Sequence, residues 1–321
     1  MLFLQKQISN LKVYNHIEQI PSLTGSVVTI GTFDGLHSGH QEVIRNLISI
    51  ANKNNTLGVV ISFNPHPRVF FDNNNKFKTL STFKEKIELF RNLGLKHLII
   101  LPFSKELADM SFEAFAEQYI VNILKAKVLV LGYDHHFGNN REGNYTNLLP
   151  FSHKHNLILE KLPPVLIDGI EVSSTKIRNA LSAGDITMAN RLLAYNYFID
   201  GKVVQGNKLG RKIGYPTVNI LLHEPTKQIP AYGVYAVKVN YDGFVFQGMM
   251  NIGIRPTINK DKETIEVNIF DFDKDIYDEN LRIFFVEKIR EEIKFETLDA
   301  LRNQLDLDKI ATKKIFNNLN N

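Results

Sequence analysis

The chain has 321 residues, of which 44% are hydrophobic, so it is long enough for two domains that each bury a core. It contains no cysteine, which excludes disulfides, thiolate metal sites and cysteine nucleophiles. The absence of cysteine fits a reducing compartment, so we expect a cytoplasmic location. A net charge of +4 is mild for this length and suits small anionic substrates better than nucleic acid. The first residues turn polar too early for a secretory signal, and no apolar run is long enough to span a membrane, so we expect no nucleic-acid or membrane partner.

Strand-like and helix-like segments alternate through the first half. The apolar runs that indicate strands lie at residues 27–30, 57–63, 97–101, 127–131 and 157–162. Helical spacing follows at 43–51, again from Thr82, where Thr82 and Glu85 have the spacing of a capping box, and over 112–124. The alternation predicts an α/β domain with a doubly wound, mostly parallel, Rossmann-like sheet, which binds ligands at the carboxyl ends of its strands.

The segment Gly31-Thr32-Phe33-Asp34-Gly35-Leu36-His37-Ser38-Gly39-His40, the histidine motif, stands where the first strand turns into a helix. Free backbone N–H groups and the helix dipole favour phosphate there, and glycine lets the backbone approach it closely. His37 and His40 can both donate to phosphate oxygens as charge develops during nucleotidyl transfer. The alternative is a plain connection in which Ser38 or Asp34 caps the helix, but this explains neither the paired histidines nor the glycines.

Two more segments follow strand ends. Asn64 and His66 lie in a proline-stiffened turn after the second strand, near the histidine motif if the first two strands are neighbours; a rigid loop with a surface histidine is the alternative. Asp134 lies in residues 132–138 after the fourth strand, where we expect a substrate loop. A metal at His135 and His136 is disfavoured, because adjacent strand residues point to opposite faces.

The hydroxyl segment, Ser173-Ser174-Thr175-Lys176-Ile177-Arg178, precedes a short predicted helix that ends near Leu181. Hydroxyls and N–H groups at a helix start can hold phosphate, and Arg178 adds a forked donor. The alternative is a Ser/Thr cap beside an exposed arginine. Paired with the histidine motif, phosphate binding is the favoured interpretation.

The second half has a different pattern. A helix over 186–193 bridges the halves, and strand-like runs then lie at 232–240, 244–252, 264–270 and 281–287, the first two flanking a Tyr-Asp-Gly hairpin turn. Helical spacing resumes from about Thr297. We predict a C-terminal antiparallel β-barrel with a terminal helix, and domains of residues 1–183 and 184–321.

The glycine-rich segment, residues 201–219, combines four glycines with several cations, which suits a polyphosphate, although it is not a P-loop. Thr217 and Asn219 alternate onto one face of a predicted strand, so a hydroxyl and an amide oxygen could meet one Mg²⁺. An ordinary loop between barrel strands is the alternative. Further on, Glu266 and Asn268 share a strand face, and Glu266 is either a solvated carboxylate or a general base on a rigid strand.

These motifs occur in the order found in one family, and the chain resembles bacterial bifunctional riboflavin kinase/FAD synthetases over nearly its whole length. The matching segments are residues 31–40, 63–67, 173–178, 214–219, 230–235, 251–257, 266–267 and 289–295. The resemblance implies that the barrel converts riboflavin and ATP to FMN and ADP. It implies that the N-terminal domain converts FMN and ATP to FAD and pyrophosphate, and that both reactions need Mg²⁺.

The resemblance also implies a role for each matching residue. In the synthetase half, His37 and His40 stabilise the ATP phosphates, Arg178 with Ser174 and Thr175 holds the pyrophosphate, and Gly31, Thr32, Phe33, Asp34 and Gly39 complete the ATP site. In the kinase half, Gly206, Lys208, Gly210, Gly214 and Pro216 bind ATP, Thr217 and Asn219 hold Mg²⁺, and Glu266 takes the proton of the ribityl hydroxyl. Asn64, Asp134 and Arg290 are placed on the flavin.

The chain departs from the family pattern in three places. Asn207 and Leu209 stand where an acid and a cation are usual, so the roles in that loop are in doubt. His136 replaces an arginine, which predicts weaker flavin binding in the synthetase half, and Asn268 replaces a histidine.

Two rival functions remain open at this point. The first is an adenylyltransferase for another phosphate whose barrel only binds a ligand. The second is an RNA-associated protein, because tRNA synthetases also carry His-x-Gly-His, although the chain lacks a long basic face.

Overall fold

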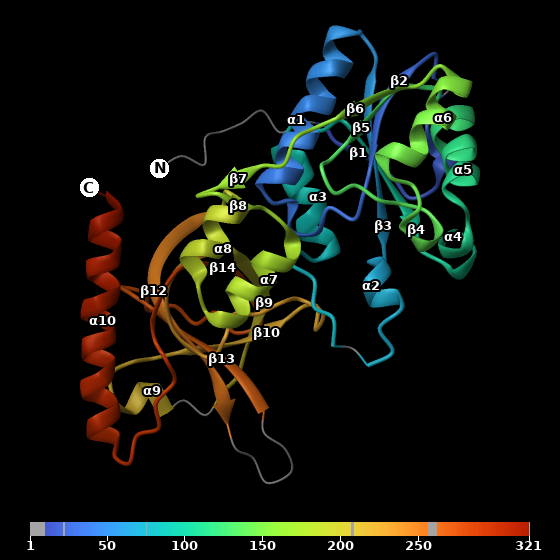
Figure 1. Cartoon of the computed structure of the whole chain (residues 1–321). Helices are drawn as coiled ribbons and strands as arrows, with labels where there is room; N and C mark the ends of the chain where they lie inside the picture. The colour runs from blue at the N-terminus through green and yellow to red at the C-terminus, as the bar shows by residue number, and fades with distance from the viewer. Residues whose placement is uncertain (1–9, 22, 75, 207–208, 256–261, 321) are drawn as a thin grey trace. The chain divides into compact units, whose positions relative to one another are not determined.

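A computed structural model describes residues 10–21, 23–74, 76–206, 209–255 and 262–320. Contacts divide the chain into two compact units, Met1–Ser174 and Thr175–Asn321, which we describe separately (Figure 1). The helix α7 (Ser174–Ala183) begins at this division. The predicted functional boundary after residue 183 stays a prediction.

The first unit is built on a six-stranded parallel sheet with the strand order β1-β4-β3-β2-β5-β6. Its strands are β1 (Lys12–Tyr14), β2 (Ser26–Ile30), β3 (Leu57–Asn64), β4 (His97–Pro102), β5 (Ala126–Leu131) and β6 (Ile158–Lys161). The five predicted strands are confirmed. Strand β1 was not predicted because it is a three-residue edge strand without an apolar run.

Helices cover both faces of this sheet (Figure 1). Helices α1 (Ser38–Lys53) and α3 (Phe83–Asn92) pack on one face, whose core includes Val27, Val60 and Leu98. On the other face, α5 (Phe112–Phe115), the π-helix η3 (Ala116–Ile123) and α6 (Tyr145–His155) pack on Val28, Ile61 and Ile99. The smaller elements are η1 (Ile17–Gln19), η2 (Asp34–Leu36), α2 (Pro67–Phe70), α4 (Lys105–Asp109), η4 (Asn139–Arg141), β7 (Leu166–Ile167) and β8 (Ile170–Glu171). The predicted doubly wound sheet is confirmed.

Two local predictions in this unit are confirmed. The Thr82 hydroxyl accepts from the Glu85 N–H at 3.2 Å, and the Glu85 carboxylate accepts from the Thr82 N–H at 2.9 Å, which is the predicted capping box. The helix expected over 112–124 is present, divided between α5 and η3.

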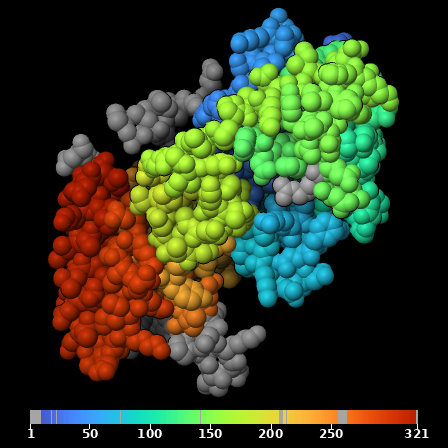
Figure 2. Space-filling model, viewed as in Figure 1, coloured from blue at the N-terminus to red at the C-terminus, as the bar shows by residue number. Residues whose placement is uncertain are grey.

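The second unit contains a closed antiparallel barrel with the strand order β10-β13-β12-β11-β14-β9. Its strands are β9 (Phe198–Val204), β10 (Val218–Leu222), β11 (Gly233–Tyr241), β12 (Phe244–Arg255), β13 (Lys262–Ile269) and β14 (Asn280–Arg290). The predicted barrel and the hairpin between β11 and β12 are confirmed. Helix α8 (Ile186–Leu193) has the predicted bounds, and α10 (Leu298–Asn320) forms an outer flank of this unit (Figure 2).

The start of the glycine-rich segment corrects the sequence analysis. Residues Gly201–Val204 belong to strand β9 rather than to a loop, and a short helix, α9 (Leu209–Lys212), follows. A Cβ atom at Gly201 would overlap Ile220 on the neighbouring strand, so this glycine permits close strand pairing. Among the described residues, no helix is long and apolar enough to cross a bilayer.

Candidate active sites

The histidine motif lies at the carboxyl end of β2, beside the end of β3. The Gly31 N–H donates to the Ile61 carbonyl at 3.0 Å, which joins the two strand ends. Asn64 is the last residue of β3 and is exposed at the same edge of the sheet, as predicted from neighbouring strands. His66 instead caps α2, because its Nδ1 accepts from the Arg68 N–H at 3.0 Å.

The two histidines of the motif stack on each other. Their ring centroids lie 3.6 Å apart, with 17° between the ring planes. His37 is also the N-cap of α1, since its Nδ1 accepts from the His40 N–H at 3.3 Å. The alternative in which Ser38 or Asp34 caps this helix is therefore wrong: the cap is one of the paired histidines.

Asp34 turns its carboxylate into the protein. The carboxylate accepts from the N–H groups of Leu80, at 2.9 Å, and Ser81, at 3.2 Å, and Asp34 is 1% exposed. Its carbonyl accepts from the Ser174 hydroxyl at 3.0 Å, which joins the hydroxyl segment to the histidine motif within the first unit. The side chain of Asp34 thus holds the loop in place.

The rest of the motif shapes the loop around His40. Phe33 has a positive φ of 48° and places its ring edge-on to His40, with centroids 5.2 Å apart. Gly31, Thr32 and Gly39 are half-buried along the same loop, and a Cβ atom at Gly39 would lie 3.3 Å from the His37 ring. The loop therefore keeps its backbone close to the two imidazoles.

His40 lies in a cationic, water-poor environment. Burial lowers the pKa of His40 well below its usual value, and the positive charges of His37, Lys86 and His135 lower this pKa further. Its Nδ1 is shielded from solvent and has no hydrogen-bond partner among the described residues. A neutral imidazole with an unused nitrogen can serve one phosphate oxygen as a hydrogen-bond donor.

Lys86 was missed by the sequence analysis. It lies on α3, is 5% exposed, and its charge acts on His40. Lys86 lies four residues before the buried Phe90 and therefore on the same helix face. A lysine on an otherwise apolar helix face was the sequence signal that could have indicated a buried cation.

Thr175 and Arg178 continue α7 after Ser174, and Thr175 is exposed. Arg178 lies one helical turn beyond Ser174. Both belong to the second unit by contacts, and their role toward pyrophosphate stays a prediction.

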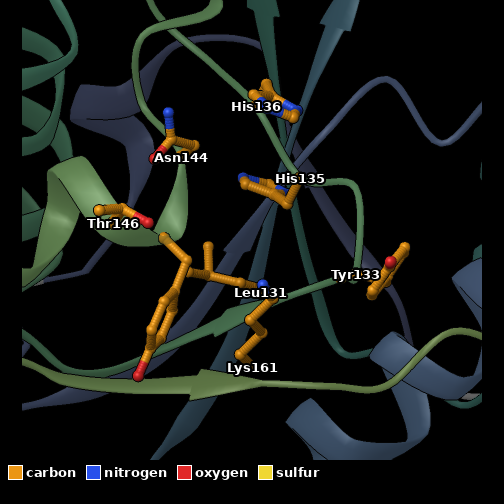
Figure 3. Close-up of a pocket in the computed structure, with 9 residues that line it drawn as sticks. Leu131, Tyr133, His135, His136, Asn144, Thr146 and Lys161 are labelled. Carbon is orange, nitrogen blue, oxygen red and sulfur yellow. The ribbon is translucent and has the colours of Figure 1, made fainter.

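The loop after β5 lines a pocket of about 180 Å³ (Figure 3). Asp134 is exposed beside it, with one carboxylate oxygen 3.3 Å from Nδ1 of His136, the residue that replaces the family's arginine. Among the described residues, no three His, Cys, Asp or Glu side chains are placed to hold a metal ion.

Because of His135, we expect the first unit to be less stable to unfolding at acidic pH. Burial, and then the charge of His136, lower the pKa of His135 from 6.5 to about 4. As the pH falls from 6.5 towards 4, His135 takes up a proton in the unfolded chain but stays neutral in the folded chain. The free energy of unfolding therefore decreases. Between about pH 6.5 and about pH 5.5 we expect His135→Phe to lose about 1 kcal/mol less unfolding free energy than the unaltered protein, as measured by urea titration. Equal losses in both proteins would contradict this.

In the second unit, the predicted kinase residues come together on the barrel. Asn219 of β10 is paired in register with Glu266 of β13. The hydroxyl of Thr217, just before β10, donates to a Glu266 carboxylate oxygen at 3.3 Å. Three side chains predicted from two separate motifs thus meet at one place.

Glycines let the surrounding loop pack against these residues. A Cβ atom at Gly206 would overlap the Asn219 amide, and one at Gly210 would overlap the Tyr215 carbonyl. Gly214 has a φ of 82°, a conformation that favours glycine. Lys208, with Asn207, lies outside the described residues.

Asn268, the other departure from the family pattern, supports the same loop. Its side-chain amide donates to the carbonyl of Pro216 at 2.7 Å, and Asn268 is 7% exposed. Pro216 immediately precedes Thr217, so this bond fixes the approach to the Thr217 hydroxyl.

The donor set fits Mg²⁺. Thr217 and Asn219 offer a hydroxyl and an amide oxygen beside the Glu266 carboxylate, and Gly206 lets the loop backbone approach the Asn219 amide. Mg²⁺ is usually held by one or two protein oxygens together with substrate phosphates and water.

Arg290 makes contacts other than those expected of a flavin-binding residue. Its Nε and Nη2 donate to the two carboxylate oxygens of Asp308 on α10, at 2.9 and 2.7 Å, and its Nη1 donates to the Glu291 carbonyl at 2.9 Å. Each guanidinium nitrogen therefore has a partner. Flavin binding by Arg290 stays a prediction, and the contacts support an indirect contribution through the position of α10.

This ion pair predicts a large stability effect. Asp308 is 1% exposed, so Asp308→Asn leaves Arg290 without its compensating charge and should cost about 3–5 kcal/mol of unfolding free energy in urea titrations. Asp299→Asn, an exposed acid on the same helix, is the matched control and should cost less than about 1 kcal/mol. Similar losses for both variants would show that the pair contributes little.

Comparisons with known proteins cover both units. Residues 19–176 match the FAD synthetase family, and residues 193–316 match the riboflavin kinase family. Proteins named bifunctional riboflavin kinase/FMN adenylyltransferase are 40% identical in Haemophilus influenzae, covering 92% of this chain and 96% of that protein, and 35% identical in Bacillus subtilis, covering 92% and 93%. A crystal structure described as a macrolide-efflux protein from Streptococcus pneumoniae is 32% identical, with a TM-score of 0.86 over 95% of this chain and 99% of that one.

Proposed function

Because the chain belongs to the family of bifunctional riboflavin kinase/FMN adenylyltransferases, we propose that each of its two units provides one of the two active sites. The enzyme phosphorylates riboflavin to FMN and adenylylates FMN to FAD, with ATP as the co-substrate of both reactions. The barrel is the kinase and the parallel-sheet unit is the adenylyltransferase. The observation that carries this assignment is that the chain holds two separate constellations, the stacked pair His37–His40 and the group Thr217, Asn219 and Glu266.

In the adenylyltransferase, a phosphate oxygen of FMN attacks the α-phosphorus of ATP and pyrophosphate leaves. The step needs little acid–base chemistry, so positioning and charge stabilisation carry it. His40 donates a hydrogen bond to a phosphate oxygen, and His37 holds both the ring of His40 and the start of α1. Gly31 and Gly39 give the phosphates access to backbone, and Ser174 receives the pyrophosphate. Asn64 and Asp134 contact the flavin.

In the kinase, the terminal hydroxyl of the ribityl chain attacks the γ-phosphorus of ATP. Glu266 accepts the proton that this hydroxyl loses, and the Thr217 hydroxyl orients the Glu266 carboxylate. Mg²⁺, which Thr217 and Asn219 would hold, neutralises phosphate charge when it is bound. The glycine-rich segment provides close backbone approach to the polyphosphate.

The rival functions are less well supported. A barrel that only binds a ligand does not account for its match to riboflavin kinases over residues 193–316. A cytoplasmic location is part of the proposal, supported by the absence of cysteine.

The test is incubation with riboflavin, ATP and Mg²⁺, followed by chromatographic separation of riboflavin, FMN and FAD. We expect both products, and neither when Mg²⁺ is chelated. FMN without FAD would refute the adenylyltransferase assignment, and unchanged riboflavin would refute the kinase assignment. Supplied FMN separates the second reaction from the first.

A further inference from the structure

The pocket that the loop after β5 lines has no part in the function proposed above. It lies at the carboxyl ends of β5 and β6 and has a volume of about 180 Å³. Figure 3 shows the side chains around it. The lining residues are Leu131, Gly132, Tyr133, His135, His136, Asn144, Tyr145, Thr146 and Lys161. The carboxyl edge of a parallel sheet is where such folds bind ligands.

Lys161 gives this pocket a positive charge that the protein does not neutralise. Its ammonium lies 5.7 Å from the ring centroid of Tyr133 and 5.2 Å from that of Tyr145. It makes no hydrogen bond or ion pair with the described residues, so two rings hold it while its N–H donors stay available. None of the residues that line the pocket is acidic.

The start of α6 adds to this positive potential. Asn144 caps the helix, with its side-chain oxygen accepting from the Asn147 N–H at 3.1 Å, and Tyr145 and Thr146 of the first turn line the pocket. The amino end of a helix carries a partial positive charge that favours anions.

His135, which lines the same pocket, carries a hydrogen-bonding atom that the protein leaves unused. Its Nε2 is shielded from solvent and has no partner among the described residues. A buried polar atom without a partner is destabilising, and a ligand bonded to it would recover that cost. The low pKa of His135 makes this ring a neutral hydrogen-bonding group at neutral pH.

We propose that this pocket binds a phosphate group of a nucleotide substrate of the first unit, with Lys161 as the charge partner and His135 as a hydrogen-bond partner. The proposal rests on the proposed adenylyltransferase function. It extends that site because β5, whose carboxyl end the pocket adjoins, pairs with β2, whose carboxyl end leads into the histidine motif. The two candidate sources of the phosphate are FMN and ATP.

Lys161→Met tests the proposal, since it keeps the side-chain stem and removes the charge. Steady-state rates of FAD formation are measured while FMN and ATP are varied in turn. We expect the KM for one of the two substrates to rise about tenfold with kcat little changed, and Lys161→Arg to restore it. A rise in the KM for FMN assigns the pocket to the FMN phosphate, and a rise in the KM for ATP assigns it to ATP.

Inorganic phosphate provides a second readout. It should inhibit FAD formation by the unaltered enzyme, and Lys161→Met and His135→Phe should each weaken this inhibition. Lys154→Met, an exposed lysine of α6 that does not line the pocket, is the matched control.

Unchanged KM values for both substrates in a folded, active Lys161→Met enzyme would overturn the proposal. Absence of FAD formation by the unaltered enzyme would instead refute the adenylyltransferase function itself. Riboflavin phosphorylation should be the same in every variant, which confirms that the second unit is intact.

Discussion

Glu266→Gln is expected to slow FMN formation from riboflavin by about 10²–10⁴-fold, the range for a lost general base. Glutamine keeps the size of the side chain and an oxygen that can accept from the Thr217 hydroxyl, so the pairing of β10 and β13 should persist. It cannot take the proton of the attacking hydroxyl. The measurement is the initial rate of FMN formation at saturating riboflavin and ATP.

FAD formation from supplied FMN is the internal control, because it takes place in the other unit and should keep its full rate. Glu287→Gln, an exposed carboxylate on β14 of the same barrel, is the matched variant and should leave both activities unchanged. If Glu266→Gln slowed both reactions equally, or neither, Glu266 would not be the base of the kinase.

The sequence was sufficient for most of the fold because apolar periodicity records which faces are buried. In the first unit, Val27 and Val28 pack into opposite layers, and this produces the continuous apolar run that predicts a parallel strand. The pattern failed at β1, where pairing with β4 sustains three residues that carry no run of their own. It failed again at β9, where Gly201 suggested a loop. The absence of a side chain at Gly201 instead allows β9 to pair closely with its neighbouring strand.

The candidate sites could be predicted where chemistry lies within one motif. The histidine pair and the Thr217–Asn219 spacing are local, and Glu266 was singled out by the alternation along its strand and by the resemblance. The hydrogen-bond and ion-pair partners of Asp34 and Arg290 could not be predicted, because they lie far away in the sequence. Asp34 bonds to backbone some 46 residues later in the chain, and Arg290 pairs with an acid on the terminal helix. Tertiary packing alone decides these contacts.

Lys86 and His135 illustrate the same limit at the functional level. Each is remote in sequence from His40, yet both affect its pKa. A lone lysine or histidine in a sequence carries no sign of which neighbours it will have. The resemblance could not supply Lys86 either, because none of its matching segments contains this position, and at residues 134–138 it gave no sign that His135 lies near His40.

His40→Ala is expected to lower the rate of FAD formation from FMN by about 10²–10³-fold, which is the usual cost of losing one donor to a developing charge. The ring of His40 stacks on His37 and touches Phe33, so its nitrogen atoms are held in fixed positions before substrate binds. Phosphate charge arriving beside a neutral imidazole raises the pKa of that imidazole and strengthens the hydrogen bond it donates. The measurement is the rate of pyrophosphate release at saturating FMN and ATP.

Because alanine also leaves a gap beside His37, the variant needs a second form and a structural check. His40→Gln fills the gap and offers an amide donor, and it should recover part of the lost rate if hydrogen bonding is what His40 supplies. His153→Ala, an exposed histidine on α6, should have no effect, and riboflavin phosphorylation should stay at its full rate in all three variants. A His40→Ala protein that unfolds at the normal temperature and still makes FAD at the normal rate would remove His40 from the catalytic site and leave its orphaned Nδ1 without a function.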